Sequence, residues 1–305
     1  MFRFSSSSLF KSVAVWGGGT MGGGIAQVAA QASIPVTVVD VSQARLDVSR
    51  KAIENSLLRV AKKQCNGEAA KMKAFVDIVV SHITFTTDEG LAATGSELVI
   101  EAIVENIDAK KELFSRIDKI APKSTVFCSN TSSLSIAEMA AATTRKDRFA
   151  GVHFFSPVAV MKLLEVVRTD DVKAEVVDKL VSFGKIIGKI PVVVKDTEGF
   201  IVNRLLLPYQ MEACRLVERG VATFQDVDTA MKHGCGYPMG PFELCDSVGI
   251  DVIKSIIDGW HRRLPEEPLF QPSKSIDELV KAGKLGKKTG EGFYKYDSQG
   301  RKVEP

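Results

Sequence analysis

The sequence predicts an α/β domain built on a mostly parallel sheet, followed by a smaller all-helical domain. The chain has 305 residues, more than a single hydrophobic core usually supports, so two domains are expected. From residue 12 to residue 194, short apolar runs alternate with segments of helical period, an order typical of a parallel sheet covered on both faces. Beyond Asp196 the patterns become helical, so the boundary between the domains is placed there.

The expected elements alternate along the first domain. Strands are predicted at residues 12–16, 36–40, 83–86, 98–103, 125–128, 149–154, 163–167 and 191–194. Helices are predicted at residues 25–32, 43–63, 69–80, 110–120, 136–142 and 174–187. The second domain should contain helices at 201–219 and 224–232, a Gly- and Pro-rich connector at 234–241 and a last strand at 292–296.

Composition excludes several classes of protein. With 45% hydrophobic and 25% charged residues the chain belongs among ordinary globular proteins, and a net charge of +3 is too small to indicate a nucleic-acid-binding protein. No apolar run approaches the roughly 20 residues that span a bilayer, so no membrane insertion is expected. The five cysteines are scattered without a Cys-x-x-Cys pair, which predicts neither disulfides nor a metal site and favours a reducing compartment.

The first eleven residues have an unusual composition. They include Arg3, Lys11 and four consecutive serines but no acidic residue, as in an organellar transit peptide. The segment is short for a transit peptide, and an unstructured start before the first strand is the alternative. Residues 1–11 are therefore predicted to form a leader or a disordered start of the chain.

A glycine-rich turn follows the first predicted strand. Gly17-x-Gly19-x-x-Gly22 opens the next helix and encloses Thr20 and Met21, and Asp40 ends the following strand 18 residues after Gly22. This strand–turn–helix–strand context is the one that the Rossmann-type dinucleotide fingerprint requires. Free N–H groups at the helix start would bind a diphosphate, so residues 12–196 are predicted to form an NAD-binding domain. The alternative is a glycine turn that binds nothing.

The residue at the end of the second strand indicates which dinucleotide is bound. Asp40 should accept hydrogen bonds from the adenosine ribose and repel a 2′-phosphate, which favours NAD over NADP. Arg45 is interpreted as a solvated helix residue rather than a phosphate ligand.

Polar residues stand near the ends of later elements. Ser132 follows a buried strand, His153 lies late in the next strand, Glu165 is framed by aliphatic residues, and Asn203 begins the second domain. Histidine suits alcohol oxidation, since its pKa lies near physiological pH and it can accept the hydroxyl proton. A carboxylate would orient the imidazole. A satisfied core histidine, and a glutamate paired with a Lys or Arg, remain equal alternatives at this point.

Several segments together resemble one family. Residues 17–27, 101–106, 129–134, 153–155, 199–204, 236–244 and 287–294 are similar to the short-chain L-3-hydroxyacyl-CoA dehydrogenases of mitochondrial β-oxidation. The similarity extends from Ser12 to Tyr296. It implies an NAD-dependent enzyme of fatty-acid metabolism that oxidises L-3-hydroxyacyl-CoA to 3-ketoacyl-CoA in the mitochondrial matrix. It also implies that residues 197–305 form a substrate and dimerisation domain of a homodimer.

The resemblance implies roles for the four polar residues. His153 corresponds to the general base and Glu165 to its orienting partner, while Ser132 and Asn203 correspond to residues that hydrogen-bond the reacting oxygen and the thioester end of the substrate. Glu105, Lys110, Ser132, Ser156 and Lys288 correspond to the family's NAD contacts beyond the glycine turn.

The resemblance also implies a CoA site and contains one departure. Ser56 and Lys63 correspond to the family's CoA contacts, and their seven-residue spacing places both on one helix face with Arg59 between them. An ordinary solvated helix face would look the same. Ser156 stands where the family often has Asn, which puts a contact at that position in doubt.

Two rival functions are kept. One is a dehydrogenase of the same architecture that acts on a free hydroxy acid. The other is a non-catalytic NAD-binding or structural protein, since a fold does not guarantee an activity.

Overall fold

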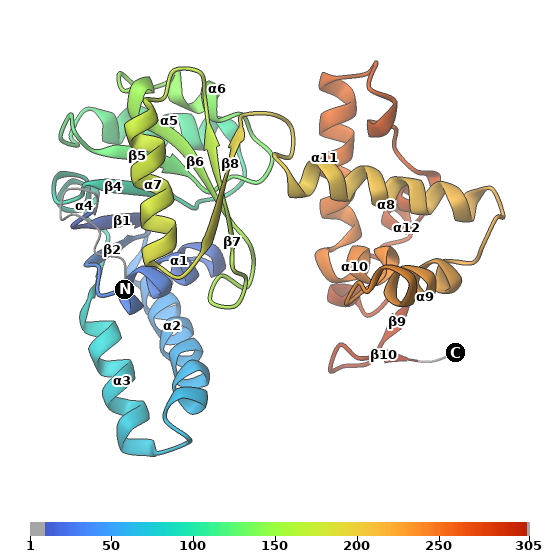
Figure 1. Ribbon diagram of the computed structural model, residues 1–305, viewed down its shortest axis with the longest axis horizontal. Coiled ribbons are helices and arrows are strands. Elements are labelled where there is room, and N and C mark those ends of the chain that lie inside the picture. The colour runs from blue at the N-terminus through green and yellow to red at the C-terminus, as the bar shows by residue number, and fades with distance from the viewer. Residues whose placement is uncertain (1–9, 304–305) are drawn as a thin grey trace. The chain divides into compact units, whose positions relative to one another are not determined.

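The structure is a computed structural model that describes residues 10–303 (Figure 1). The predicted leader therefore lies outside the described residues except for its last two. The chain divides into two compact units between Phe200 and Ile201, four residues beyond the boundary expected at Asp196. Phe200 is 4% exposed and packs in the apolar core of the first unit.

The first unit is built on one sheet of eight strands in the order β3-β2-β1-β4-β5-β6-β7-β8. The strands are β1 (Val13–Trp16), β2 (Val36–Val39), β3 (Ile83–Thr86), β4 (Leu98–Glu101), β5 (Val126–Ser129), β6 (Phe149–Phe154), β7 (Leu163–Arg168) and β8 (Ile190–Lys195). All neighbouring strands are parallel except β6 and β7, which run antiparallel. The mostly parallel sheet predicted from the sequence is confirmed.

Helices cover both faces of this sheet. They are α1 (Thr20–Gln31), α2 (Gln43–Gln64), α3 (Ala69–Ser81), α4 (Glu89–Thr94), α5 (Ile107–Asp118), α6 (Ile136–Ala140) and α7 (Ala174–Ile186), with a 3-10 turn η2 (Lys146–Arg148). The sequence did not predict α4, which is short. In Figure 1, α2 and α3 form a hairpin that extends away from the sheet.

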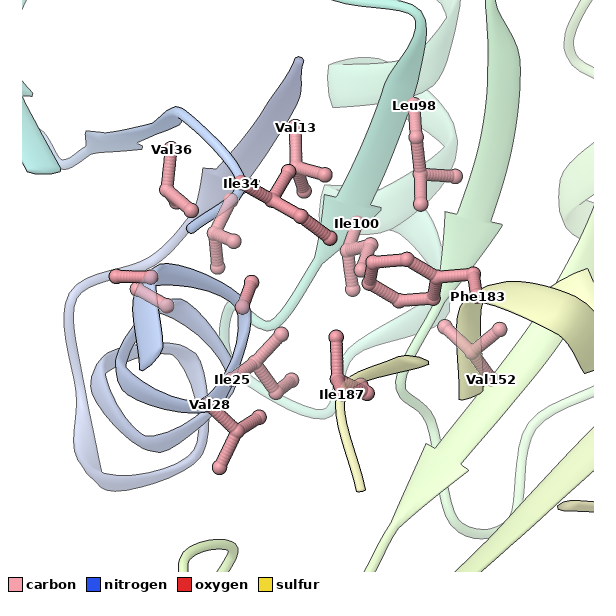
Figure 2. Close-up of a cluster of buried hydrophobic side chains, with 14 of the residues drawn as sticks. Val13, Ile25, Val28, Ile34, Val36, Leu98, Ile100, Val152, Phe183 and Ile187 are labelled. Atoms are coloured by element: carbon pink, nitrogen blue, oxygen red, sulfur yellow. The ribbon is translucent and has the colours of Figure 1, made fainter. Parts of the chain in front are cut away.

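Two apolar clusters lie on opposite faces of the sheet. Side chains of α1, α2, α3 and α7 pack with one set of alternating strand residues, and Figure 2 shows the part around Ile25, Ile100 and Phe183. Side chains of α4, α5 and α6 pack with the other set, around Phe114 and Phe127. Burial on both faces explains why the strands read as nearly continuous apolar runs.

The second unit is helical, as predicted. It contains α8 (Val202–Glu218), α9 (Phe224–Cys235), α10 (Pro241–Val248), α11 (Ile250–Arg263) and α12 (Lys274–Lys281), with 3-10 turns η3 (Pro268–Phe270) and η4 (Lys287–Thr289). The strand expected at 292–296 is shorter: β9 (Lys295–Tyr296) pairs antiparallel with β10 (Lys302–Val303), which the sequence did not predict. Across residues 10–303, no helix has both the length and the hydropathy needed to cross a bilayer.

Candidate active site

The glycine turn between β1 and α1 has a geometry that only glycine allows. Gly17 has φ +97°, and a Cβ there would lie 2.5 Å from the carbonyl oxygen of Ala102. A Cβ on Gly22 would lie 1.8 Å from the carbonyl oxygen of Gly17, so the helix packs directly on the turn. A Cβ on Gly19 would meet nothing within 4 Å, so the turn is open on that side. The open side leaves room for a ligand to approach the backbone.

The start of α1 and the end of β2 complete this region. No side chain caps the first turn of α1, which begins at Thr20 and contains no acidic residue. Its N–H groups and the positive end of the helix dipole therefore suit an anion. Asp40 follows β2, and its Oδ2 accepts a hydrogen bond of 2.8 Å from the backbone N–H of Gly18. The uncapped helix start beside a carboxylate fits the diphosphate and ribose of a dinucleotide.

His153 and Glu165 are brought together by the antiparallel pair of strands. The two residues are opposite each other in the register of β6 and β7, and His153 Nδ1 lies 2.7 Å from Glu165 Oε2. His153 is 4% exposed and Glu165 is fully buried. The carboxylate can only accept, so the proton is assigned to Nδ1, and the lone pair of the imidazole is then on Nε2. Both expected residues thus form one pair.

Ser132 lies on the other side of the imidazole. Its Oγ is 3.0 Å from His153 Nε2, and its backbone N–H donates to Glu105 Oε1 over 3.1 Å. The rings of Phe155 and Phe200 flank His153, with centroid distances of 4.5 and 5.6 Å. The imidazole is therefore held at both nitrogens and enclosed by aromatic side chains.

A cluster of charged side chains, most of them buried, is connected to Ser132 by hydrogen bonds. Lys110, 1% exposed, places Nζ 2.6 Å from Glu101 Oε1 and 3.2 Å from Glu105 Oε2. Glu101 Oε2 also accepts a 2.5 Å hydrogen bond from the hydroxyl of Ser129. Glu105 Oε1 accepts a hydrogen bond of 2.5 Å from Thr131 Oγ1. A hydrogen-bonded path thus leads from Glu101 to the residue before Ser132.

The two carboxylates of the cluster titrate differently. Burial raises the pKa of Glu101 above its ordinary value, although Lys110 and Ser129 oppose this effect. Burial acts in the same direction on Glu105, but Lys110 and the hydrogen bonds from Thr131 and Ser132 outweigh it, so the pKa of Glu105 is lowered. Glu105, whose side chain is 42% exposed, is therefore the more acidic member of the cluster and the one that faces outward.

Sequence reasoning did not single out Glu101. The available signal was a carboxylate at the end of an otherwise apolar strand, where an unpaired charge would be expensive to bury. Such a residue implies a cationic partner, which α5 supplies as Lys110.

The remaining predicted residues lie elsewhere. Ser56 and Lys63 are on α2, where Ser56 is half-buried and Lys63 is exposed. Ser156 is exposed in the loop that follows β6. Asn203, in α8, and Lys288, in η4, belong to the second unit. In that unit Lys288 Nζ lies 2.5 Å from Asp251 Oδ1.

The described residues contain no group of three or more His, Cys, Asp or Glu that could hold a metal ion. The arrangement that the structure does show is a base, its carboxylate partner and a hydroxyl donor.

Comparison with known proteins decides the family. Residues 12–197 match the family description "3-hydroxyacyl-CoA dehydrogenase, NAD binding domain", and residues 199–296 match "3-hydroxyacyl-CoA dehydrogenase, C-terminal domain". The chain belongs to the 3-hydroxyacyl-CoA dehydrogenase family. The resemblance inferred from the sequence is thereby confirmed. In this dehydrogenase the NAD-binding part contains the glycine turn, His153 and Glu165, and the C-terminal part contains Asn203 and Lys288.

Individual 3-hydroxyacyl-CoA dehydrogenases match almost the whole chain. The chain is 56% identical over 288 residues to the mitochondrial hydroxyacyl-coenzyme A dehydrogenase of Rattus norvegicus, covering 94% of this chain and 92% of the relative. It is 55% identical to the protein of that name from Homo sapiens, over the same shares. The solved structure of (S)-3-hydroxybutyryl-CoA dehydrogenase from Ralstonia eutropha matches with a TM-score of 0.89 at 36% identity, covering 95% of this chain and all of that one.

Proposed function

We propose that the protein oxidises L-3-hydroxyacyl-CoA to 3-ketoacyl-CoA with NAD, as a step of fatty-acid β-oxidation. The observation that carries this proposal is His153, held between Glu165 at 2.7 Å and Ser132 at 3.0 Å. It lies at the carboxyl end of β6, a strand that belongs to the same parallel set as β1 and its glycine turn. Ligands of open α/β sheets bind beyond these strand ends.

The residues of the chain account for the proton in this reaction. His153 Nε2 removes the proton of the substrate's 3-hydroxyl, and Glu165 stabilises the imidazolium that forms. The hydroxyl of Ser132 donates to the reacting oxygen, where charge develops. NAD supplies a nicotinamide ring that accepts the hydride from C3 when it is bound.

The NAD site would be formed mainly by the glycine turn. The residues proposed to hold the cofactor are Gly17, Gly19, Thr20, Met21, Gly22, Asp40, Glu105, Lys110, Ser132, Ser156 and Lys288. Support comes from the open side of the turn and the uncapped start of α1. Because Lys110 is almost fully buried and holds two carboxylates, we propose that it acts on the cofactor chiefly through Glu105.

The substrate is proposed to engage two further groups of residues. Ser56 and Lys63 would contact CoA from one face of α2, where Arg59 adds a second exposed cation. Asn203 would hydrogen-bond the thioester end of the acyl group. Support for Asn203 is the family match alone.

A kinetic comparison tests the function. The wild-type protein should form NADH with 3-hydroxybutyryl-CoA and not with free 3-hydroxybutyrate. His153→Ala should reduce kcat by about 10²–10⁴-fold with NADH binding little changed. His233→Ala removes an exposed histidine of α9 and should leave kcat unchanged. Wild-type rates by the folded His153→Ala protein would contradict the assignment, and turnover of the free acid would favour the rival hydroxy-acid dehydrogenase.

The assembly proposed is a homodimer formed through the helical unit. The segment from Phe242 to Ile250 is largely apolar and lies in this unit, but both of those end residues are buried within the unit. Within the same segment, Val248 is 46% exposed and could contact a partner subunit. A monomeric mass in sedimentation at micromolar concentration would contradict the dimer.

The location proposed is the mitochondrial matrix. The relatives from Rattus norvegicus and Homo sapiens are named as mitochondrial proteins, and the first eleven residues have the composition of a transit peptide. A fluorescent protein fused to the C-terminus of the full chain should enter mitochondria, and deletion of residues 2–11 should abolish its import.

A further inference from the structure

A buried lysine holds the loop that follows the proposed catalytic strand. Lys189 lies immediately before β8 and is 7% exposed. Its Nζ donates to the carbonyl oxygen of Val158 and, over 2.7 Å, to that of Met161. Both carbonyls belong to residues 155–162, the loop that joins β6 to β7 (Figure 1).

The partners of this ammonium are unusual. Lysine is seldom buried unless it is paired, and within residues 10–303 the hydrogen bonds of Lys189 Nζ go to main-chain carbonyls. Burial and the nearby Lys162 lower the pKa of Lys189 to about 8. Burying the Lys189 ammonium costs solvation free energy. Its position is best explained by its hydrogen bonds, which fix the backbone of the loop.

The loop folds so that its carbonyls converge on Lys189. The backbone N–H groups of Val160 and Met161 both donate to the carbonyl oxygen of Pro157, each over 2.9 Å. This turn brings the carbonyls of Val158 and Met161 to one side. Without the Lys189 ammonium, the carbonyl oxygens of Val158 and Met161 would lose a charged hydrogen-bond donor.

One side chain of the loop fits tightly against the proposed cofactor helix. Val158 is 4% exposed, and a Cβ on Gly24 would lie 2.7 Å from Val158 Cβ. Gly24 belongs to α1, two residues after Gly22. Glycine at this position lets the loop lie directly on the helix that starts at the glycine turn.

We propose that Lys189 is a positioning residue for the NAD site. By fixing residues 155–162, it seats Val158 on Gly24 and sets the position of Ser156. The inference rests on the proposed function in one respect, because it takes α1 and the loop that follows β6 to form part of the NAD site.

The expected effect is on cofactor affinity rather than on the chemical step. His153 and Glu165 lie within paired strands and hold each other. A looser loop therefore leaves the base in place while the surface around α1 loses its fixed shape.

Direct titration of NADH, followed by its fluorescence, tests the proposal without turnover. Lys189→Met should raise the Kd of NADH by about tenfold, the loss expected when a charged donor is removed from a loop that frames the site. The KM for NAD should rise in parallel and kcat should change by less than about twofold. Lys185→Met removes an exposed lysine of α7 and should leave the Kd unchanged. An unchanged Kd in folded Lys189→Met, or a fall in kcat alone, would overturn the proposal.

A double-mutant cycle separates positioning from general stability. If Lys189 acts through Val158, Lys189→Met should raise the Kd by only about twofold in a Val158→Ala background, because coupled residues are not additive. Additive effects would refute the route through Val158. Should Lys189→Met fail to fold, Gly24→Ala should weaken NADH binding by about fivefold or more, and Val158→Gly should restore it, because it removes the Cβ that the new methyl group would meet. No restoration would likewise refute it.

The outcome is distinguishable from failure of the proposed function. A wild-type protein that binds NADH but oxidises no 3-hydroxyacyl-CoA refutes the proposed reaction and leaves the Lys189 measurement intact. A wild-type protein that does not bind NADH refutes both.

Discussion

Both units of the chain bury carboxylates, but they satisfy them in different ways. In the first unit Glu101 and Glu165 face ionisable partners, a lysine at 2.6 Å and an imidazole at 2.7 Å. In the second unit Asp228 and Asp246 face neutral donors. Asp246 accepts from the backbone N–H groups of Phe293 and Tyr294 and from the hydroxyl of Tyr296, each over 2.9 Å.

The difference separates a reactive cluster from a structural one. Asp228 likewise accepts from two backbone N–H groups at the start of α10 and from the hydroxyl of Tyr294. Burial raises the pKa of Asp228 and Asp246, and no cation in either set of hydrogen bonds offsets it. The cluster of the first unit instead leads to the half-exposed Ser132, through Glu105. Ionisable side chains that pair with one another and are connected to a partly exposed residue can take part in catalysis. Buried carboxylates that accept hydrogen bonds from neutral donors instead hold segments of the chain together.

The largest effect is expected at the imidazole pair. Glu165→Gln should lower kcat by about 10²–10⁴-fold, because an amide cannot stabilise the imidazolium and can offer an N–H that favours the wrong tautomer. Steady-state kinetics measure it, with Glu175→Gln on the exposed start of α7 as the matched control. A near-normal kcat would show that Glu165 is only structural and would erase the contrast between the two units.

The next largest effect is expected at Lys110, the buried lysine that pairs with Glu101. Lys110→Met should lower the free energy of unfolding by about 3–5 kcal/mol at pH 7, because it leaves the buried Glu101 without its cation. Denaturant unfolding measures this loss, and Lys111→Met, a change at a less buried neighbour paired with Glu138, is the control.

The pH dependence of Lys110→Met provides an internal check. The pKa of Glu101 is already raised in the folded protein, and loss of Lys110 raises it further. A carboxyl with a raised folded pKa keeps its full stability below its unfolded pKa and loses stability as the pH rises. The destabilisation should therefore be small near pH 4 and grow toward pH 7. Equal destabilisation at both pH values would show that packing, not charge, is the cause.

Sequence alone could predict the elements whose signals are local. The glycine turn, the apolar strands and the helical periods are patterns within a few residues, and they predicted the parallel sheet and the helical second unit. The pairing of His153 with Glu165 depends on the antiparallel register of β6 and β7. That register is set by the loop between the strands and not by either residue, so the resemblance to a family was needed to choose this pairing.

The features that the sequence did not predict depend on tertiary contacts. The partner of Glu101 comes from a helix that begins after β4, and no local pattern marks Lys110 as buried. The strand β10 contains only Lys302 and Val303, both exposed, and exists because it pairs with β9. The role of Lys189 depends on carbonyls that lie about 30 residues earlier in the chain.

A smaller effect is expected in the structural cluster of the second unit. Asp246→Ala should lower the free energy of unfolding by about 2–3 kcal/mol, because it leaves two backbone N–H groups and the hydroxyl of Tyr296 without their acceptor. The kcat of the folded protein should stay within a few-fold of the wild type. Denaturant unfolding and kinetics on the same preparation measure both, with the more exposed Asp258→Ala as control. A large loss of kcat without loss of stability would place Asp246 among the reactive groups.

The smallest effect is expected at an exposed carboxylate that also has cationic partners. Hydrogen bonds from Arg148 and Lys173 lower the pKa of Asp147 to about 2, but its side chain is 37% exposed and solvent screens the pairs. Asp147→Asn should therefore cost about 0.5 kcal/mol at pH 7 in denaturant unfolding. A carboxyl with a lowered pKa stabilises the fold above its unfolded pKa of about 4, and this contribution disappears as the pH falls toward 2. The difference from the wild type should therefore disappear as the pH falls from about 4 toward 2, a lower pH range than the one in which the effect of Lys110→Met changes. If Asp147→Asn lowered the free energy of unfolding as much as Lys110→Met does, the charge of the partner would explain the stabilisation by ion pairs in the first unit, and burial would not be needed.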